Sequence, residues 1–297
     1  MDTQANGVVP LSERRMAEQL ERGEVVHFPV CPFGLPAGDD LAFLLQQRLA
    51  SRAHKNIGYD PLTGKVTGFA PGPAGPDERL GRLLGDFSRT VTRWMTTTFP
   101  GYARGWRLDR VSYRPEEEAT RRLRRTARND LLHVDAFPSR PTNGWRILRV
   151  FANINPSEPR VWITTDAFAR LLERFGREVG LPEGSQPALW NRLASGLLRA
   201  VRLGRHRSAY DAFMLRFHNF LKWNDDFQKH CAKRQWHFAP GSAWLAITDT
   251  TSHAVLSGRF ALEHSYFLDP KTLALPGESP PALLQKACGF EVLDPAA

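Results

Sequence analysis

Leu131-Leu132-His133-Val134-Asp135-Ala136-Phe137 places a histidine and an aspartate two positions apart in an apolar run that favours a β-strand. On a strand, residues i and i+2 project from the same face, so His133 and Asp135 are expected to present an imidazole and a carboxylate to one point. The pair supplies two of the three ligands of the 2-His-1-carboxylate triad that holds non-haem Fe(II). No other histidine in the chain has Asp or Glu two residues after it. Because His-x-Asp also arises by chance, the rest of the chain has to supply the third ligand.

Composition points to an ordinary globular protein. The chain has 297 residues, of which 42% are hydrophobic and 24% charged, so it can bury a large core. No run approaches the length of a membrane-spanning helix, and residues 1–10 lack the pattern of a secretory signal, so the cytoplasm is the expected compartment. The three cysteines, Cys31, Cys231 and Cys288, are too scattered for a disulfide framework or a zinc finger.

The balance of charge favours an anionic partner. The net charge is +9 and the pI about 9.9, with arginine dominating the basic residues. Nucleic acid, an anionic membrane surface, or a substrate with phosphates and carboxylates would each fit. No helix-turn-helix, zinc-finger or RNA-binding motif is recognisable, so nucleic acid is not the expected partner.

Hydrophobic spacing divides the chain into four regions. Helical spacing dominates the first, in which Ser12 and Asp39 are expected to cap the first two helices. Strands begin near Trp106, and helical spacing returns after residue 165 before the strands resume. The predicted regions are an N-terminal helical region that packs on the barrel (1–105), the first half of a jelly-roll (106–165), a helical insertion (166–230), and the second half of the jelly-roll with a C-terminal tail (231–297). The expected helices are 13–22, 39–49, 77–97 and 283–288, and helical spacing recurs inside the insertion at 168–175, 189–201 and 210–221. The expected strands are 25–28, 107–113, 131–137, 145–154, 235–238, 243–248, 253–259 and 260–268. Residues 54–76 are expected to form a loop.

The order of these parts favours an α+β protein built on a double-stranded β-helix, the jelly-roll or cupin-like barrel, with N-terminal helices and a helical insertion. In that fold a metal sits between the two sheets. His253 is the favoured third ligand, because it follows a complete apolar strand and precedes Gly258-Arg259. His237 and His264 remain alternatives.

An Fe(II) triad of this kind can bind a 2-oxo acid such as 2-oxoglutarate through two oxygens and leave a position for O2. The far carboxylate of the cosubstrate then needs a basic partner inside the barrel. Arg149 and Arg259 are the candidates, and Tyr113 or Asn153 could add a hydrogen bond. Arg149 and Asn153 share one face of their strand, which either lines a polar cavity or faces solvent.

Several stretches resemble the family of 3-deoxy-D-manno-oct-2-ulosonic acid (Kdo) hydroxylases. They are SYRP at 112–115, HVDAFPSRP at 133–141, RILRVFANINP at 146–156, TD at 248–249 and SHAVLSG at 252–258. The resemblance implies an Fe(II)/2-oxoglutarate-dependent dioxygenase that hydroxylates C3 of Kdo in Kdo-lipid A, the inner core of lipopolysaccharide, and releases succinate and CO2.

The resemblance also implies roles for residues. His133, Asp135 and His253 would be the metal ligands, and Arg140, Arg160 and Asn56 are candidates for contact with the substrate. The family commonly has glutamine where this chain has Arg259, which favours Arg149 as the cosubstrate clamp.

Docking on an anionic membrane would place the protein peripherally at the inner face of the inner membrane. The alternatives are an oxygenase of the same fold that acts on protein or nucleic acid, and a non-catalytic jelly-roll binding module.

Overall fold

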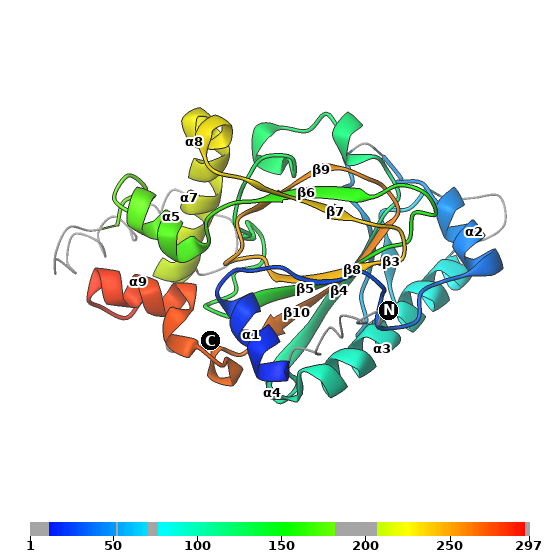
Figure 1. Cartoon of the computed structure of the whole chain (residues 1–297), viewed down its shortest axis with the longest axis horizontal. Helices are drawn as coiled ribbons and strands as arrows, with labels where there is room; N and C mark the ends of the chain where they lie inside the picture. The colour runs from blue at the N-terminus through cyan, green and yellow to red at the C-terminus, as the bar shows by residue number, and fades with distance from the viewer. Residues whose placement is uncertain (1–11, 52, 71–76, 182–206, 295–297) are drawn as a thin grey trace, which may run out of the picture.

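The computed structural model describes residues 12–51, 53–70, 77–181 and 207–294, and within them it is an α+β protein with two antiparallel sheets. In spatial order the larger sheet contains β1 (Val26–Phe28), β8 (Ala243–Ile247), β5 (Arg146–Asn153), β10 (Ala261–Leu268), β4 (Trp106–Arg114), β2 (Ile57–Tyr59) and β3 (Val66–Thr67). The smaller sheet contains β7 (Arg234–Phe238), β6 (Arg160–Thr164) and β9 (His253–Ser257). Figure 1 shows the smaller sheet lying over the larger one.

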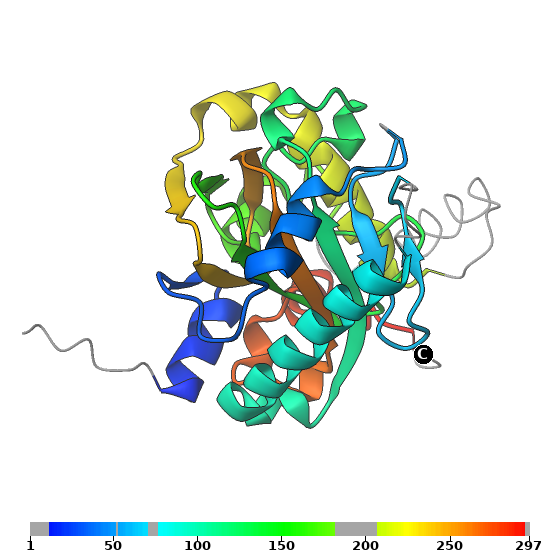
Figure 2. The same ribbon diagram turned by 90° about the vertical axis from the view of Figure 1, so that its right-hand side faces the viewer.

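Helices cover the outside of the larger sheet and one end of the structure. They are α1 (Glu13–Glu21), α2 (Gly38–Gln46), α3 (Asp77–Thr98), α4 (Pro100–Ala103), α5 (Phe168–Phe175), α7 (Ala209–Trp223), α8 (Asp225–His230) and α9 (Pro280–Cys288), with short 3₁₀ turns at Glu118–Thr120, Arg125–Ala127, Pro270–Thr272 and Pro276–Glu278. Figures 1 and 2 show α3 along the outer face of the larger sheet, while α5, α7 and α8 lie together at one end. No helix in these ranges is long and apolar enough to cross a membrane.

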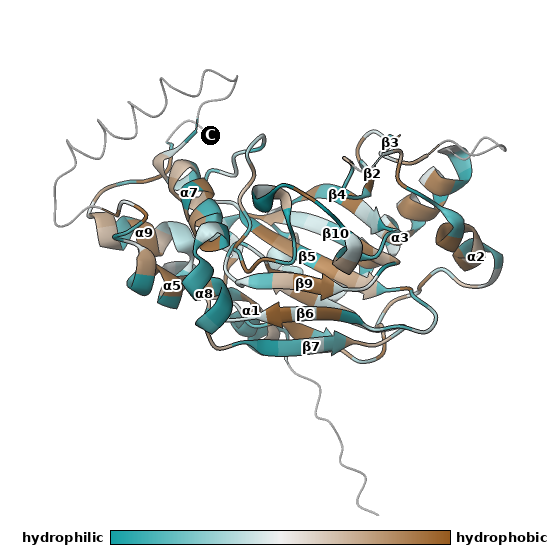
Figure 3. Ribbon diagram, turned by 90° about the horizontal axis from the view of Figure 1, so that it is seen from above, coloured by the Kyte–Doolittle hydropathy of each residue, from teal (hydrophilic) through white to brown (hydrophobic). Residues whose placement is uncertain are grey.

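Two apolar cores explain this arrangement. Leu84, Phe87 and Val91 recur at helical spacing on α3 and pack against Leu148 and Leu262 of the larger sheet. A second core joins α5, α7 and α9 to the underside of the segment around Val134. Figure 3 shows β7 as largely hydrophilic, which agrees with the exposure of most of this edge strand.

Most of the expected elements are present, with corrections. Ser12 caps α1 through a hydrogen bond from the Arg15 amide, but Asp39 lies inside the first turn of α2, whose N-cap is Ala37. The expected loop at residues 54–76 contains β2 and β3, and the strand β6 was not expected. The spacing at Leu189, Leu193, Leu197 and Val201, and the basic residues Arg199, Arg202 and Arg205, lie outside the described residues.

The stretch around His133 is also corrected. It was expected to be a regular strand, yet it is an extended segment with a single bridge between His133 and His253. A bend at residues 138–140 follows the extended run after only a few residues. His133 and Asp135 still converge, although the segment makes no longer ladder.

Candidate active site

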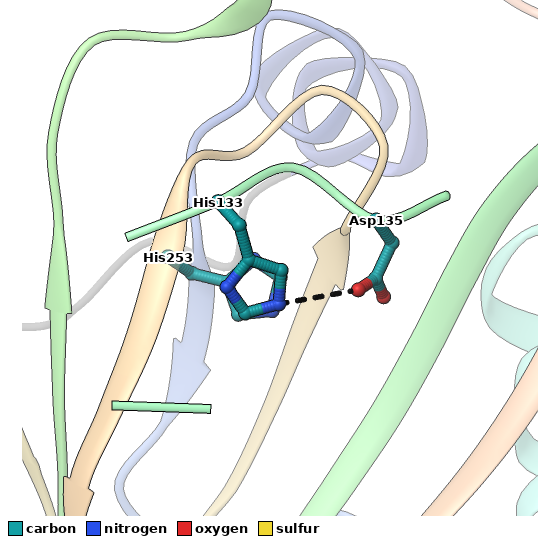
Figure 4. Close-up of side chains that lie close together, drawn as sticks. All are labelled: His133, Asp135 and His253. Carbon is teal, nitrogen blue, oxygen red and sulfur yellow. Dashed lines mark ion pairs between the residues drawn. The ribbon is translucent and has the colours of Figure 1, made fainter. Parts of the chain in front are cut away.

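Backbone pairing brings the three expected ligands together. The His133 amide donates to the His253 carbonyl at 3.1 Å, and the His253 amide donates back to His133 at 2.9 Å. Two residues later, the Asp135 amide donates to the Thr248 carbonyl at 2.8 Å. The extended segment is thereby held beside the start of β9 and the end of β8. Figure 4 shows the three side chains pointing toward one another.

The turn that carries His253 is fixed from inside the protein. Arg146 on β5 is fully buried, and its Nε donates to Asp249 Oδ2 at 2.8 Å. Asp249 Oδ1 also accepts from the Ile147 amide. Because a buried charge requires a paired partner, this ion pair ties the turn between β8 and β9 to the larger sheet.

The donor set suits a divalent transition metal. One ligand atom from each of His133, Asp135 and His253 lies within 4.8 Å of the others. His133 Nδ1 donates to the Leu131 carbonyl at 2.7 Å, and His253 Nδ1 donates to the Thr251 carbonyl at 2.9 Å. Because a carbonyl can only accept, both rings keep Nε2 unprotonated when neutral, which is the form that binds a metal.

Burial keeps the triad in the charge state that a metal needs. It lowers the pKa of both triad histidines, well below the usual value for His133, so the imidazoles are neutral. Burial alone would raise the pKa of Asp135, but the charge of Arg149 holds it well below its usual value. His133 Nε2 lies 3.5 Å from Asp135 Oδ1, the contact drawn in Figure 4. Two neutral imidazoles and one carboxylate therefore face a common point.

An ion-pair chain stands behind Asp135. Arg149 Nη2 lies 2.8 Å from Asp135 Oδ2, in an ion pair without hydrogen-bond geometry, and Arg149 Nη1 donates to Glu263 Oε1 at 2.5 Å. Arg114 donates to the other Glu263 oxygen at 2.7 Å. Burial alone would raise the pKa of Glu263, but the two arginines lower it to about 2. Asp135 is thus oriented by a charged network that spans β4, β5 and β10.

The triad lines a cavity of about 480 Å³ that has room for a drug-sized ligand. Eight Lys or Arg side chains line it, against three Asp or Glu. Phe151 and Trp162 form part of its apolar wall, and Trp162 stacks on the His253 ring at a centroid distance of 5.1 Å. The excess of cations suits anionic ligands.

Of the four residues expected to hold the cosubstrate, the structure places one at the cavity and three elsewhere. Arg149 lines the cavity, so the polar face of β5 serves a cavity rather than solvent. Tyr113 is buried and its hydroxyl donates to the Leu44 carbonyl at 2.7 Å, while the Asn153 amide donates to Phe238 and Glu158 carbonyls. The Arg259 guanidinium lies 4.5 Å from the centre of the Phe260 ring. Of these four side chains, Arg149 is the one placed at the cavity.

The residues expected to contact substrate all line the cavity. Arg140 donates to Asp109 at 2.5 Å, and Asn56 donates to the Ser112 hydroxyl at 2.7 Å. Arg160 is 1% exposed, donates to the Gly258 carbonyl at 2.8 Å, and lies 4.0 Å from Glu118. Burial and then the charge of Arg114 lower the pKa of Arg160 to about 10.

The two alternative ligands lie elsewhere. His264 is buried beneath α3 and pairs with the Ser88 hydroxyl at 2.8 Å, and His237 pairs with Gln235 on the exposed edge strand. The choice of His253 as third ligand is therefore confirmed.

Sequence reasoning missed two side chains of α7. His218 lines the cavity, and its ring centre is 4.9 Å from that of His133. Its Nδ1 donates to the Val134 carbonyl at 2.7 Å. Lys222, one helical turn later, lines the cavity as well. Their spacing of four residues places both on one face of the helix, which was the available signal.

Comparison with known proteins supports the same site. The family model for 3-deoxy-D-manno-oct-2-ulosonic acid (Kdo) hydroxylase matches residues 4–291. No curated protein matches the sequence.

Solved structures of the Kdo hydroxylase KdoO, a non-heme Fe(II) α-ketoglutarate-dependent dioxygenase, are similar over nearly the whole chain. The complex with α-ketoglutarate and Fe(III) is 32% identical, with a TM-score of 0.80 over 95% of this chain and 91% of that one. The cobalt(II) complex is 30% identical, with a TM-score of 0.84 over 100% and 97%. The complex with succinate and Fe(III) is 30% identical, with a TM-score of 0.81 over 100% and 97%.

Proposed function

Since the chain belongs to the Kdo hydroxylase family of Fe(II)/2-oxoglutarate-dependent dioxygenases, we propose that it hydroxylates C3 of Kdo in Kdo-lipid A. The observation that carries the proposal is the His133, Asp135 and His253 triad on the wall of a cationic cavity. A dianionic cosubstrate and a sugar acid both call for such a lining. When bound, iron supplies the oxidative chemistry, in which one atom of O2 enters succinate and the other becomes the sugar hydroxyl while CO2 leaves.

The residues around the triad have distinct roles in this proposal. Arg149 was the favoured clamp for the far carboxylate of 2-oxoglutarate. Its two carboxylate contacts, to Asp135 and Glu263, favour a role in orienting Asp135. Arg160 fits the clamp better, because it is buried, its Nε has no hydrogen-bond partner among the described residues, and its nearest carboxylate, on Glu118, is 4.0 Å away. Arg140 and Asn56 remain candidates for contact with the sugar.

We also assign the two sheets to a double-stranded β-helix. In chain order β4, β5, β8 and β10 belong to the larger sheet, and they lie in the order β8-β5-β10-β4. The segment at His133 pairs with the free edge of β9, and it thereby supplies a fourth member of the smaller sheet. The chain passes between the sheets in the alternation that such a barrel requires, which supports the assignment.

A membrane location is part of the proposal. Lipid A carries phosphates at the membrane surface, and the net charge of +9 would favour peripheral docking there, on the cytoplasmic side of the inner membrane. Binding to vesicles that contain anionic lipid, but not to neutral ones, would support this location. Equal binding to both kinds of vesicle would count against it.

The proposed reaction is tested with Fe(II), 2-oxoglutarate, O2 and Kdo-lipid A. We expect one added oxygen atom on the Kdo residue, and one succinate for each hydroxylated sugar. Mass spectrometry of the released sugar locates the oxygen, and succinate is counted in the same samples. Succinate formation without a modified sugar would refute Kdo as the substrate, while leaving the dioxygenase chemistry intact.

A further inference from the structure

The cations that line the cavity are not equivalent. Four of the eight are arginines with a carboxylate within 4.0 Å, namely Arg114, Arg140, Arg149 and Arg160. Arg110 and Arg124 are exposed to solvent. Lys55 and Lys222 are different, because both are sheltered and neither has a carboxylate within 4.0 Å among the described residues. They are the two sheltered cations of the cavity that have no carboxylate within 4.0 Å among the described residues.

Lys222 is the more deeply placed of the pair. It lies in the last turn of α7, is 1% exposed, and donates from Nζ to the Thr126 carbonyl at 3.0 Å. An ammonium group has three protons, and Thr126 accepts one. Burial and then the charge of Lys55 lower the pKa of Lys222 to about 8. A buried ammonium with a single protein acceptor costs stability unless a ligand or water completes its shell.

Lys55 lines the same cavity but comes from a part of the chain far from α7 in the sequence. It is half-buried on the segment before β2, and Arg121 holds its backbone carbonyl with a hydrogen bond of 2.8 Å. Its ammonium makes no hydrogen bond within the described ranges. Burial lowers its pKa, as does the charge of Arg114, whereas Asp135 raises it. Asp135 acts on Lys222 in the same direction, so both ammonium groups lie within electrostatic range of the triad.

The structure of the proposed substrate explains why two ammonium groups without a carboxylate partner would line the cavity near the triad. In a 3-deoxy-oct-2-ulosonic acid the carboxyl carbon is C1, and the deoxy carbon C3 is two bonds away from it. Any pose that brings C3 to the metal also brings the carboxylate close to the triad. That carboxylate would be desolvated in the cavity, where it needs cations that are not already neutralised.

We propose that Lys55 and Lys222 form the binding site for the C1 carboxylate of the sugar acid, a role that rests on the proposed Kdo hydroxylase function. One side chain comes from the segment before β2 and the other from α7, which follows β6. The site is therefore complete only when both parts of the chain are packed against the barrel. Its ligand is a carboxylate beside the reacting carbon, not a phosphate of lipid A.

The test is a binding measurement by calorimetry on the iron-loaded protein with 2-oxoglutarate under nitrogen. The probes are the methyl glycoside of Kdo and its C1 carboxamide, a neutral group of nearly the same size and shape as the carboxylate. The unmodified protein is expected to bind the acid tenfold to hundredfold more tightly than the amide, roughly the effect of one charge-assisted hydrogen bond. Lys55→Met and Lys222→Met should each lose most of this preference, because the affinity for the acid falls while the affinity for the amide stays the same.

Lys229→Met is the matched control, since Lys229 is exposed on the neighbouring helix α8 and should keep the full preference. If Lys222→Met does not fold, Lys55→Met decides, because its ammonium has no hydrogen-bond partner among the described residues. Absence of binding of the acid to the unmodified protein, or an undiminished preference in the lysine variants, overturns the proposal. Lysine-dependent binding of the acid without hydroxylation of Kdo-lipid A would instead refute the function and leave the carboxylate site standing.

Discussion

Replacing Glu263 with Gln should destabilise the protein by roughly 3 kcal/mol at neutral pH. Glu263 is 1% exposed and pairs with Arg149 and Arg114, whose side chains are each 13% exposed. The pKa of Glu263 is lowered from 4.5 to about 2, which at about 1.4 kcal/mol per unit gives this magnitude. Loss of one partner from a buried ion pair has a cost of similar size, about 3–5 kcal/mol.

The pH dependence of this effect has a definite sign. Because the folded pKa lies below the unfolded one, the contribution of Glu263 is complete above pH 4.5 and is lost as the pH falls toward 2. Urea unfolding of the wild type and of Glu263→Gln should therefore differ by roughly 3 kcal/mol at pH 7 and by about 1 kcal/mol at pH 3.

An exposed ion pair provides the control. Glu173 lies 3.2 Å from Arg170, and both side chains are more than two-thirds exposed at 68% and 76%. Glu173→Gln should change the free energy of unfolding by less than about 0.5 kcal/mol. A Glu263→Gln variant that is as stable as this control, or one whose destabilisation is the same at both pH values, would refute the reasoning about the Arg149 network.

Further predictions concern the site itself. His133→Ala should abolish turnover and reduce bound iron, whereas His237→Ala on the exposed edge strand should do neither; metal analysis beside succinate release checks both. Arg160→Ala should raise the KM for 2-oxoglutarate at least tenfold, and Arg259→Ala should leave it nearly unchanged, the reverse order being the contrary result. Because the pKa of Lys222 is about 8, the affinity for the Kdo methyl glycoside should fall as the pH rises from 7 to 9, and a flat profile would contradict the role of this lysine.

The sequence was informative where function demands a local pattern. His133 and Asp135 are two residues apart and His253 follows an apolar strand, so the triad could be predicted without the fold. The triad itself pointed to iron and a 2-oxo acid cosubstrate, and the family resemblance then added the class of sugar substrate.

What could not be predicted depends on partners that are distant in the chain. Arg149 meets Glu263 across 114 positions, and no local pattern distinguishes an arginine so paired from one free to bind a ligand. Asn153 shares a strand face with Arg149, yet its amide is taken by the Phe238 carbonyl. Lys222 resembles an ordinary solvated residue near a helix end, and only the packing of α7 against the rest of the fold buries it.

The helical segment between β6 and β7 has a consequence for how such enzymes diversify. The three metal-binding side chains come from the extended segment around His133 and from the start of β9, whereas His218 and Lys222 on the cavity wall come from α7. One part of the cavity wall therefore comes from a stretch of the chain that holds none of the metal ligands. A related protein with a different segment between β6 and β7 would keep the three metal ligands but would have a different cavity wall. It would therefore be expected to oxidise a different substrate.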